Sequence, residues 1–161
     1  MAIEDRPWNT FNFVVEIVPQ GDSKPLCDAA FAECDGLDMT MDVQTIRSGG
    51  ANDRAWRVPA VINYTNLTLK RGMTSNLELW KWFRRTIDNP YLRADADVVM
   101  LADDGKAELA RFRLSRCIPI KLKAPALNAK EGAIAIEEFQ LAYDKFELVE
   151  EASKDQAEAA V

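Results

Sequence analysis

The alternation of apolar and polar positions predicts a chain built mostly of strands. In residues 11–18, apolar side chains at Phe11, Phe13, Val15 and Ile17 alternate with more polar positions, which is the period of a half-buried strand. The same reasoning predicts further strands over 31–41, 62–70, 98–101, 107–114, 118–123 and 132–146. Seven short strands joined mostly by short turns are typical of an all-β architecture.

Four local features refine this pattern. Gly36 interrupts the second strand, which indicates a bulge or a close approach of another backbone segment. The apolar phase in the last strand changes between Ile136 and Phe139, which predicts a bulge near Glu137 and Glu138. The polar, glycine-containing stretch 47–53 is predicted to be a loop, and Asp103-Asp104-Gly105 is typical of a hairpin turn.

One helix is expected between the strands. Ser75 stands three residues before Glu78, which predicts a capping box. The helix should continue through Ile87 and stop before Pro90. The sum is a mainly β fold of two packed antiparallel sheets, a sandwich or partial barrel, with one packed α-helix. Residues 1–146 should form this domain, and residues 147–161 form a charged tail that is helical or disordered.

The helix carries more apolar surface than one core needs. Its apolar arc spans about 220° of the helical wheel, against the roughly 100° stripe of an ordinary surface helix. Two interpretations are open. Either Trp82 is covered by its own chain, or the helix lies between subunits and Trp82 meets a neighbour, because Trp is enriched at interface hot spots. The candidate subunit interface comprises Leu79, Trp82, Phe83 and Arg84.

Two strands present rows of positive charge. Arg111 and Arg113 alternate with apolar neighbours, and so do Lys121 and Lys123. These side chains form an ordinary solvated sheet face, or they line a channel or pair with acidic groups of an adjacent subunit. The acidic residues available for such pairing are Glu16, Glu137 and Glu138.

Composition narrows the function classes. The 161 residues carry a net charge of −6, which disfavours tight binding to nucleic-acid phosphates or anionic lipid. The chain has no histidine, so Ser-His-Asp catalysis, Cys-His catalysis and histidine metal sites are excluded. Its three cysteines, Cys27, Cys34 and Cys117, have no metal-ligand spacing and are expected to be reduced packing residues. We therefore expect no enzyme, no cofactor and no metal site.

Targeting signals are also missing from the pattern. No apolar run is long enough to cross a bilayer, and the first residues lack the basic and apolar regions of a signal peptide. The expected location is the bacterial cytoplasm, or a particle that is assembled there.

The order of four stretches resembles the tail-tube family of contractile phages and extracellular contractile injection systems. The first is FNFVVEI at 11–17, and the second is AFAECDGLD at 30–38 followed by RSGGAN at 47–52. The third, and the most specific, is YTNLTLKRG at 64–72 with LWKW at 79–82. The fourth is PALNA at 125–129 followed by IAIEE at 134–138.

The resemblance implies a structural protein rather than an enzyme. Six copies would form a ring whose strands join into a continuous barrel around a lumen, and the rings would stack head to tail. Expected partners are other copies of the chain, a sheath protein, baseplate or tube-initiator proteins, and a cargo of protein or phage DNA. After assembly, the protein would lie inside the phage tail or injection-system particle. The alternatives are a tube-initiating paralogue at the baseplate and a stand-alone β-sandwich that binds a ligand.

The resemblance also assigns a stacking element. Residues 44–56 resemble the family's extended hairpin, which reaches the next ring. The candidate ring-stacking residues are Gln44, Arg47, Ser48, Gly49, Gly50, Asn52, Arg54, Trp56 and Arg57. The candidate lumen or inter-subunit polar face comprises Arg111, Arg113, Lys121, Lys123 and Glu137.

Overall fold

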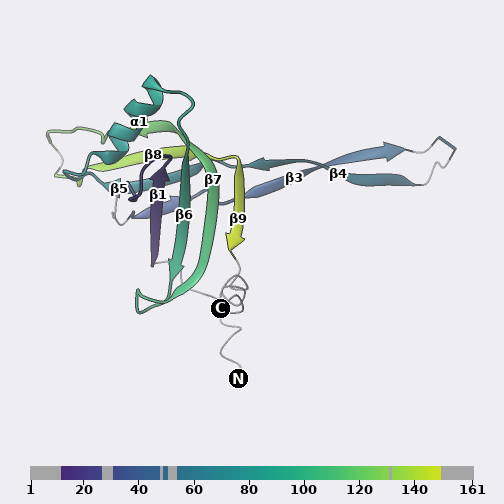
Figure 1. The fold of residues 1–161 in the computed structure, drawn as a ribbon, viewed down its shortest axis with the longest axis horizontal. Coiled ribbons are helices and arrows are strands. Elements are labelled where there is room, and N and C mark those ends of the chain that lie inside the picture. The colour runs from purple at the N-terminus through teal and green to yellow at the C-terminus, as the bar shows by residue number, and fades with distance from the viewer. Residues whose placement is uncertain (1–11, 27–30, 48, 51–53, 131, 150–161) are drawn as a thin grey trace.

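Nine strands and one helix make up the part of the chain that the computed structural model describes, which is residues 12–26, 31–47, 49–50, 54–130 and 132–149 (Figure 1). The elements run in the order β1 (Phe13–Pro19), β2 (Glu33–Asp35), β3 (Met39–Arg47), β4 (Ala55–Tyr64), β5 (Leu67–Gly72), α1 (Glu78–Asp88), β6 (Ala94–Leu101), β7 (Glu108–Lys123), β8 (Ile136–Ala142) and β9 (Lys145–Val149).

A folded seven-stranded sheet forms the body, with the strand order β1-β6-β7-β8-β5-β2 and β9 paired to β7. All of these pairings are antiparallel. The long strand β7 pairs with β6 and β9 along its first part and with β8 from Ile118 onward. Arg116, with a φ of 56°, lies where β7 changes partners.

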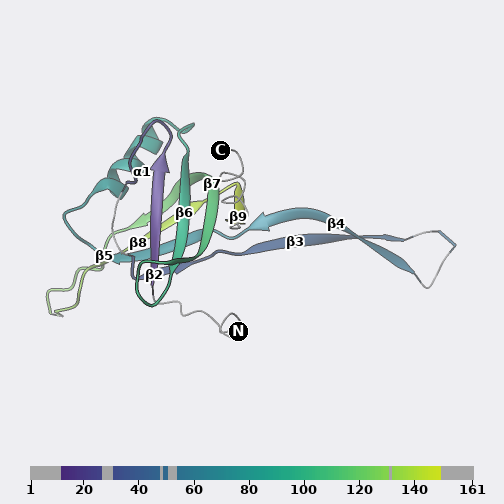
Figure 2. The same ribbon diagram turned by 60° about the horizontal axis from the view of Figure 1, so that its bottom comes forward.

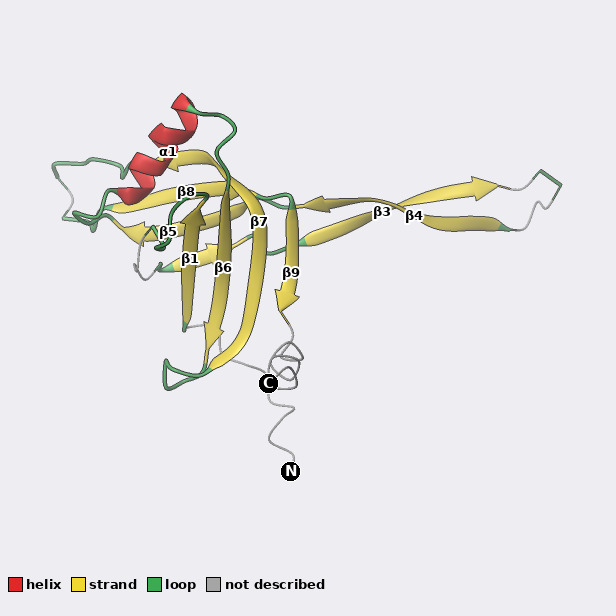
Figure 3. Cartoon of the chain, viewed as in Figure 1, coloured by secondary structure: helices red, strands yellow, loops and turns green. Residues whose placement is uncertain are grey.

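We call β1, β6, β9 and the first part of β7 the first layer, and β2, β5, β8 and the last part of β7 the second layer. Strands of the two layers run across one another, and α1 lies against one end of them (Figure 3). The expected fold of two antiparallel sheets with one helix is confirmed. The body extends slightly past the expected boundary at residue 146, because β9 ends at Val149.

The core lies between the layers. β1 and β6 contribute Val15, Ile17, Ala96 and Val98, and the second layer contributes Leu67, Leu69, Phe139 and Leu141. These residues alternate along their strands as the sequence pattern predicts. The helix adds Leu79 and Trp82, and the Trp82 ring lies 5.6 Å from the ring of Phe139.

Several predicted strands are divided differently in the structure. The predicted strand 31–41 is split into β2 and the start of β3, and 62–70 covers the end of β4 and most of β5. The predicted strands 107–114 and 118–123 are one continuous strand, β7. Gly36 explains the first split. It has a φ of +106°, and a Cβ there would lie 2.2 Å from the Asn66 carbonyl oxygen, so the expected close backbone approach is confirmed.

A two-stranded arm of β3 and β4 leaves the body (Figure 2). β3 continues to Arg47 and β4 begins at Ala55, so the connection is residues 48–54, displaced by one residue from the predicted loop 47–53. The first part of β4 was not predicted as a strand. Residues 48 and 51–53 of that connection lie outside the described residues.

The bulge expected near Glu137 and Glu138 is absent from the β5–β8 pairing. β8 pairs with β5 without interruption from Leu67–Leu141 to Gly72–Ile136, and the irregularity lies instead on β7 between Pro119 and Lys121. Every second residue of β8 points inward along the whole strand, and Glu137, not Ile136, is one of these inward residues. The expectation failed because an inward-facing glutamate looks polar in the sequence.

Arg71 is the reason that a glutamate can point inward. Arg71 and Glu137 are directly opposed on β5 and β8, and they are 2% and 1% exposed. The Nε of Arg71 donates a hydrogen bond to a carboxylate oxygen of Glu137, and Nη2 donates to the Asn76 carbonyl at 2.8 Å. The indole Nε1 of Trp80 donates to the other Glu137 oxygen at 2.9 Å. The guanidinium also lies 5.8 Å from the centre of the Phe31 ring, which is a cation–π distance.

The helix occurs where it was predicted, but its start differs. No side chain caps Leu77, the residue at the N-cap position, so the Ser75–Glu78 capping box is not formed. Instead, the Asn76 side chain accepts a hydrogen bond from the Glu78 amide at 3.1 Å. The predicted Asp103-Asp104-Gly105 turn is confirmed, since the Gly105 amide donates to the Ala102 carbonyl at 2.8 Å and Gly105 has a φ of +72°.

Gly36→Ala is expected to destabilise the fold by at least about 3 kcal/mol, because the added Cβ requires a backbone shift as well as a strained φ. The matched control is Gly21→Ala. Gly21 also has a positive φ, +91°, but nothing lies within 4 Å of its Cβ position. Its loss should be limited to about 1–2 kcal/mol of left-handed strain. Urea unfolding of both variants measures the difference, and equal losses would contradict the close approach.

Glu137→Ala is expected to lower the free energy of unfolding by about 3–5 kcal/mol, because it leaves the buried Arg71 charge without its carboxylate. Glu138→Ala is the control. Glu138 is the next residue but lies on the outer face, where its loss should cost less than about 1 kcal/mol. Chemical denaturation of the two variants tests the contrast, and a Glu137→Ala loss as small as that of Glu138→Ala would contradict the buried pair.

Candidate assembly surfaces

The arm is almost entirely exposed. Every residue of β3 is exposed, and so is every residue of β4 except Tyr64. Many of these side chains are large and apolar: Met39, Met41, Val43, Ile46, Trp56, Val58, Val61 and Ile62. An isolated two-stranded hairpin is marginally stable in water, and exposed large apolar side chains gathered on one element are typical of an interaction surface. The arm is therefore the strongest candidate for contact with another protein surface.

The predicted ring-stacking residues lie along the outer part of this arm. Gln44 and Arg47 are on β3, whereas Trp56 and Arg57 are on β4, and Ile46 pairs with Trp56 across the hairpin. Gly49, Gly50 and Arg54 belong to the connection between the strands, and Ser48 and Asn52 lie outside the described residues. Their role in stacking stays a prediction.

The structure decides between the two interpretations of the helix. Leu79 and Trp82 are 0% exposed, so they pack inside their own chain and are not available to a neighbour. The interpretation in which Trp82 is covered by its own chain is therefore correct. The residues that the helix presents outward include Leu77, Arg84 and Ile87, and Phe83 is half-buried against the core. The wide apolar arc arose because both sides of the helix are apolar, which left the buried side ambiguous.

The arginines on the first layer are paired within the chain. Arg111 Nη1 lies 2.7 Å from Asp97 and 3.6 Å from Glu16, and Nη2 lies 2.6 Å from Glu108. Of these partners, Glu108 and then Asp97 raise the pKa of the Arg111 guanidinium. Arg113 also contacts Asp97, at 3.2 Å. This face is thus a solvated network of opposite charges, and a pairing of Glu16 with an adjacent subunit is not needed to explain it.

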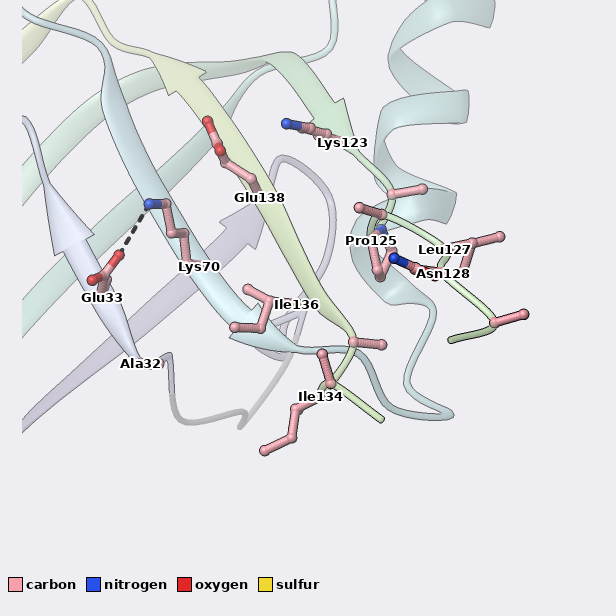
Figure 4. Close-up of a pocket in the computed structure, with 15 residues that line it drawn as sticks. Ala32, Glu33, Lys70, Lys123, Pro125, Leu127, Asn128, Ile134, Ile136 and Glu138 are labelled. Carbon is pink, nitrogen blue, oxygen red and sulfur yellow. Dashed lines mark ion pairs between the residues drawn. The ribbon is translucent and has the colours of Figure 1, made fainter. Parts of the chain in front are cut away.

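The outer face of the second layer is hollow and charged. Its hollow is bordered by residues 124–129 and 133–136, among which Leu127 and Ile134 are exposed (Figure 4). Lys121 and Lys123 lie on this face, and Lys121 Nζ is 3.6 Å from Glu138. Glu137 does not belong to it, because it points into the core, so its assignment to a polar face was wrong. Its partner Arg71 was missed, although both fall on the apolar phase of their strands.

The described residues offer little catalytic chemistry. No group of three or more potential metal ligands occurs among them. Cys34 and Cys117 are free thiols, and burial raises the pKa of each to about 12, so neither is a thiolate near neutral pH. Cys27 lies outside the described residues. The one helix among the described residues is not long and apolar enough to cross a membrane.

Comparison with known proteins places these surfaces in context. A family model described as "T4-like virus tail tube protein gp19" matches residues 9–147. A chain from the anti-feeding prophage (AFP) baseplate is similar with a TM-score of 0.78 and 23% identity, covering 89% of this chain and 96% of that one. No match was found among curated proteins.

Two further solved structures come from an extracellular contractile injection system named PVC. A chain of its sheath–tube complex has 26% identity and a TM-score of 0.76, with 90% and 93% of the two chains covered. A chain of its sheath/tube terminator has 25% identity and a TM-score of 0.77, with coverage of 91% and 99%.

Two tryptophans provide a test of which surfaces are internal. Trp82→Ala is expected to reduce the free energy of unfolding by about 3–5 kcal/mol, because it empties a buried site against Phe139. Trp56 on the arm is 61% exposed, so Trp56→Ala should change stability by less than about 0.5 kcal/mol. Thermal and urea unfolding of the dilute protein distinguish the two. A stable Trp82→Ala variant would show that the indole is not part of the core.

Proposed function

Because the chain belongs to the T4-like virus tail tube protein family and is a tail tube protein, we propose that six copies close into a ring and that the rings stack into the inner tube of a contractile particle. The observation that carries this proposal is the arm, whose apolar strands are left exposed by the described part of the chain. A ring and a stack of rings supply that surface, because each arm can lie on another copy.

The six-fold count and the partners are supported by the similar structures. The AFP baseplate structure is described as six-fold symmetrised, and the PVC structure is described as a sheath–tube complex. By analogy, this chain would assemble in the bacterial cytoplasm and then lie inside a sheath, in contact with baseplate proteins. Its lumen would carry protein or phage DNA.

Each surface then has a proposed role. The arm residues Gln44, Arg47, Trp56 and Arg57 contact the next ring. Phe83 and Arg84 remain candidates for a lateral contact, whereas Leu79 and Trp82 do not, because they belong to the core. The hollow outer face of the second layer is the candidate lumen wall, and strands of neighbouring copies join beside it into a continuous barrel. This role is structural and uses no catalytic residue. Membership of the family disfavours the stand-alone ligand-binding module.

Negative-stain electron microscopy and native mass spectrometry of the purified protein at high concentration test the proposal. The expected result is rings or hollow tubes with six copies per layer. A baseplate or tube-initiator nucleus added to the same sample should increase tube formation if free subunits are monomeric. A chain that stays monomeric at every concentration and with such a nucleus would contradict the proposed tube.

The arm can be tested in the same assay with the double variant Trp56→Asp/Val61→Asp. Both side chains are more than 60% exposed, so the fold should persist while tube length and yield fall sharply. Tyr91→Asp is the matched control, because Tyr91 is 86% exposed but lies outside the arm. If the arm variant formed tubes of the same length and yield as the wild type, the arm would not be an assembly contact.

A further inference from the structure

The second layer ends in two open strand edges. Among the described residues, β2 pairs only with β5, and the pairing of β7 with β6 stops at Cys117. The last part of β7, from Ile118 to Lys123, therefore pairs only with β8. Open edges present unpaired backbone N–H and C=O groups, which are a template for pairing with another chain.

The directions of the strands allow the two edges to meet in a second copy. The layer has the order β2, β5, β8 and β7, and each neighbouring pair is antiparallel. Four is an even number, so β2 of a second copy placed beside β7 runs antiparallel to it. The same contact can then be repeated from copy to copy. This is a heterologous contact, which gives a ring when the rotation between copies closes.

Charges of alternating sign cross this layer in register. Glu33 is opposite Lys70, Lys70 is opposite Glu138, and Glu138 is opposite Lys123. Figure 4 shows these four side chains following one another across the hollow face. Lys70 Nζ lies 3.2 Å from Glu33. We call these four residues the charge ladder. The second row along the face begins with Asp35 on β2 and ends with Lys121 on β7.

The two edges of the layer therefore differ in sign. The β2 edge is acidic, through Glu33 and Asp35, and the β7 edge is basic, through Lys121 and Lys123. Lys123 and Asp35 form no ion pair with any residue in the described part of the chain. Each edge thus carries one charge without an ion-pair partner among the described residues, Asp35 on β2 and Lys123 on β7. A second copy presents the opposite charge at the matching position.

We propose that the charge ladder continues across the subunit boundary, with the basic β7 edge of one copy seated against the acidic β2 edge of the next. This inference rests on the proposed function and specifies its lateral contact. Lys123 and Lys121 are paired with Glu33 and Asp35 of the neighbouring copy. A contact between two β7 edges, or between two β2 edges, would place like charges side by side and is therefore excluded. Because the four ladder residues carry two positive and two negative charges, the wall that they line carries compensated charge.

The proposal can be tested with two charge-reversal variants that should restore assembly when they are mixed. In Glu33→Lys/Asp35→Lys both edges are basic, and in Lys121→Glu/Lys123→Glu both edges are acidic. Each variant alone should lose at least tenfold in ring and tube yield by electron microscopy. An equimolar mixture should recover assembly, because basic and acidic edges then alternate around the ring, and native mass spectrometry should find equal numbers of the two. Lys106→Glu, a reversal at the β6–β7 hairpin, is the control and should assemble as the wild type does.

The outcomes separate the two proposals. If either variant alone assembles like the wild type, the ladder does not cross the boundary, although the tube itself stands. If both variants fail and the mixture fails as well, charge complementarity is not the cause, and the inference is overturned. If the wild type forms no ring with or without a nucleus, the proposed function fails, and the ladder proposal fails with it.

Discussion

The buried ion pair between Arg71 and Glu137 is the constraint on which the rest of the second layer depends. Both groups are almost completely excluded from water, so separating them would leave an isolated charge in the core. A slip of one residue between β5 and β8 would separate them and would also turn every side chain of the slipped strand to the other face. The pair therefore fixes the register of these strands more strictly than their apolar residues could. That register sends Lys70 and Glu138 outward and opposite each other.

The same pair ties the sheet to the helix. Trp80 at the start of α1 donates to Glu137, and the Asn76 carbonyl just before the helix accepts from Arg71. With its first turn held in this way, α1 directs Leu79 and Trp82 into the space between the layers. The helix is thus part of the body, and the surface left for other copies is the arm, the outer helix face and the two sheet edges. One internal contact consequently determines which surfaces remain for assembly.

The sequence predicted the elements whose burial is decided within one chain. The alternation in β1, the Asp103-Asp104-Gly105 hairpin, the close approach at Gly36 and the position of the helix all have a local physical cause, and all are confirmed. Prediction from the sequence failed where the environment of a side chain depends on partners that are far away in the sequence. Glu137 looked outward-facing because its partner Arg71 is 66 residues away in sequence. The first part of β4 was missed because its apolar residues face no core of this chain, so alternation carries no information there. The face of α1 was ambiguous because both of its sides are apolar.

Among the surfaces left for assembly, the arm and the charged sheet edges differ in what they can contribute. Apolar burial scales with area, so the arm is suited to supplying most of the free energy of association. Exposed ion pairs are worth at most about 1 kcal/mol each, so the ladder cannot hold a ring together by itself. What opposite charges supply is discrimination between arrangements, because a wrong register places like charges side by side. A weak lateral contact also leaves a subunit monomeric in dilute solution. In a closed ring the same contact is made at every boundary, and the closure makes the last contact intramolecular and so stabilises the whole ring. A tube subunit needs this combination, since it must remain soluble before assembly and adopt a single arrangement during it.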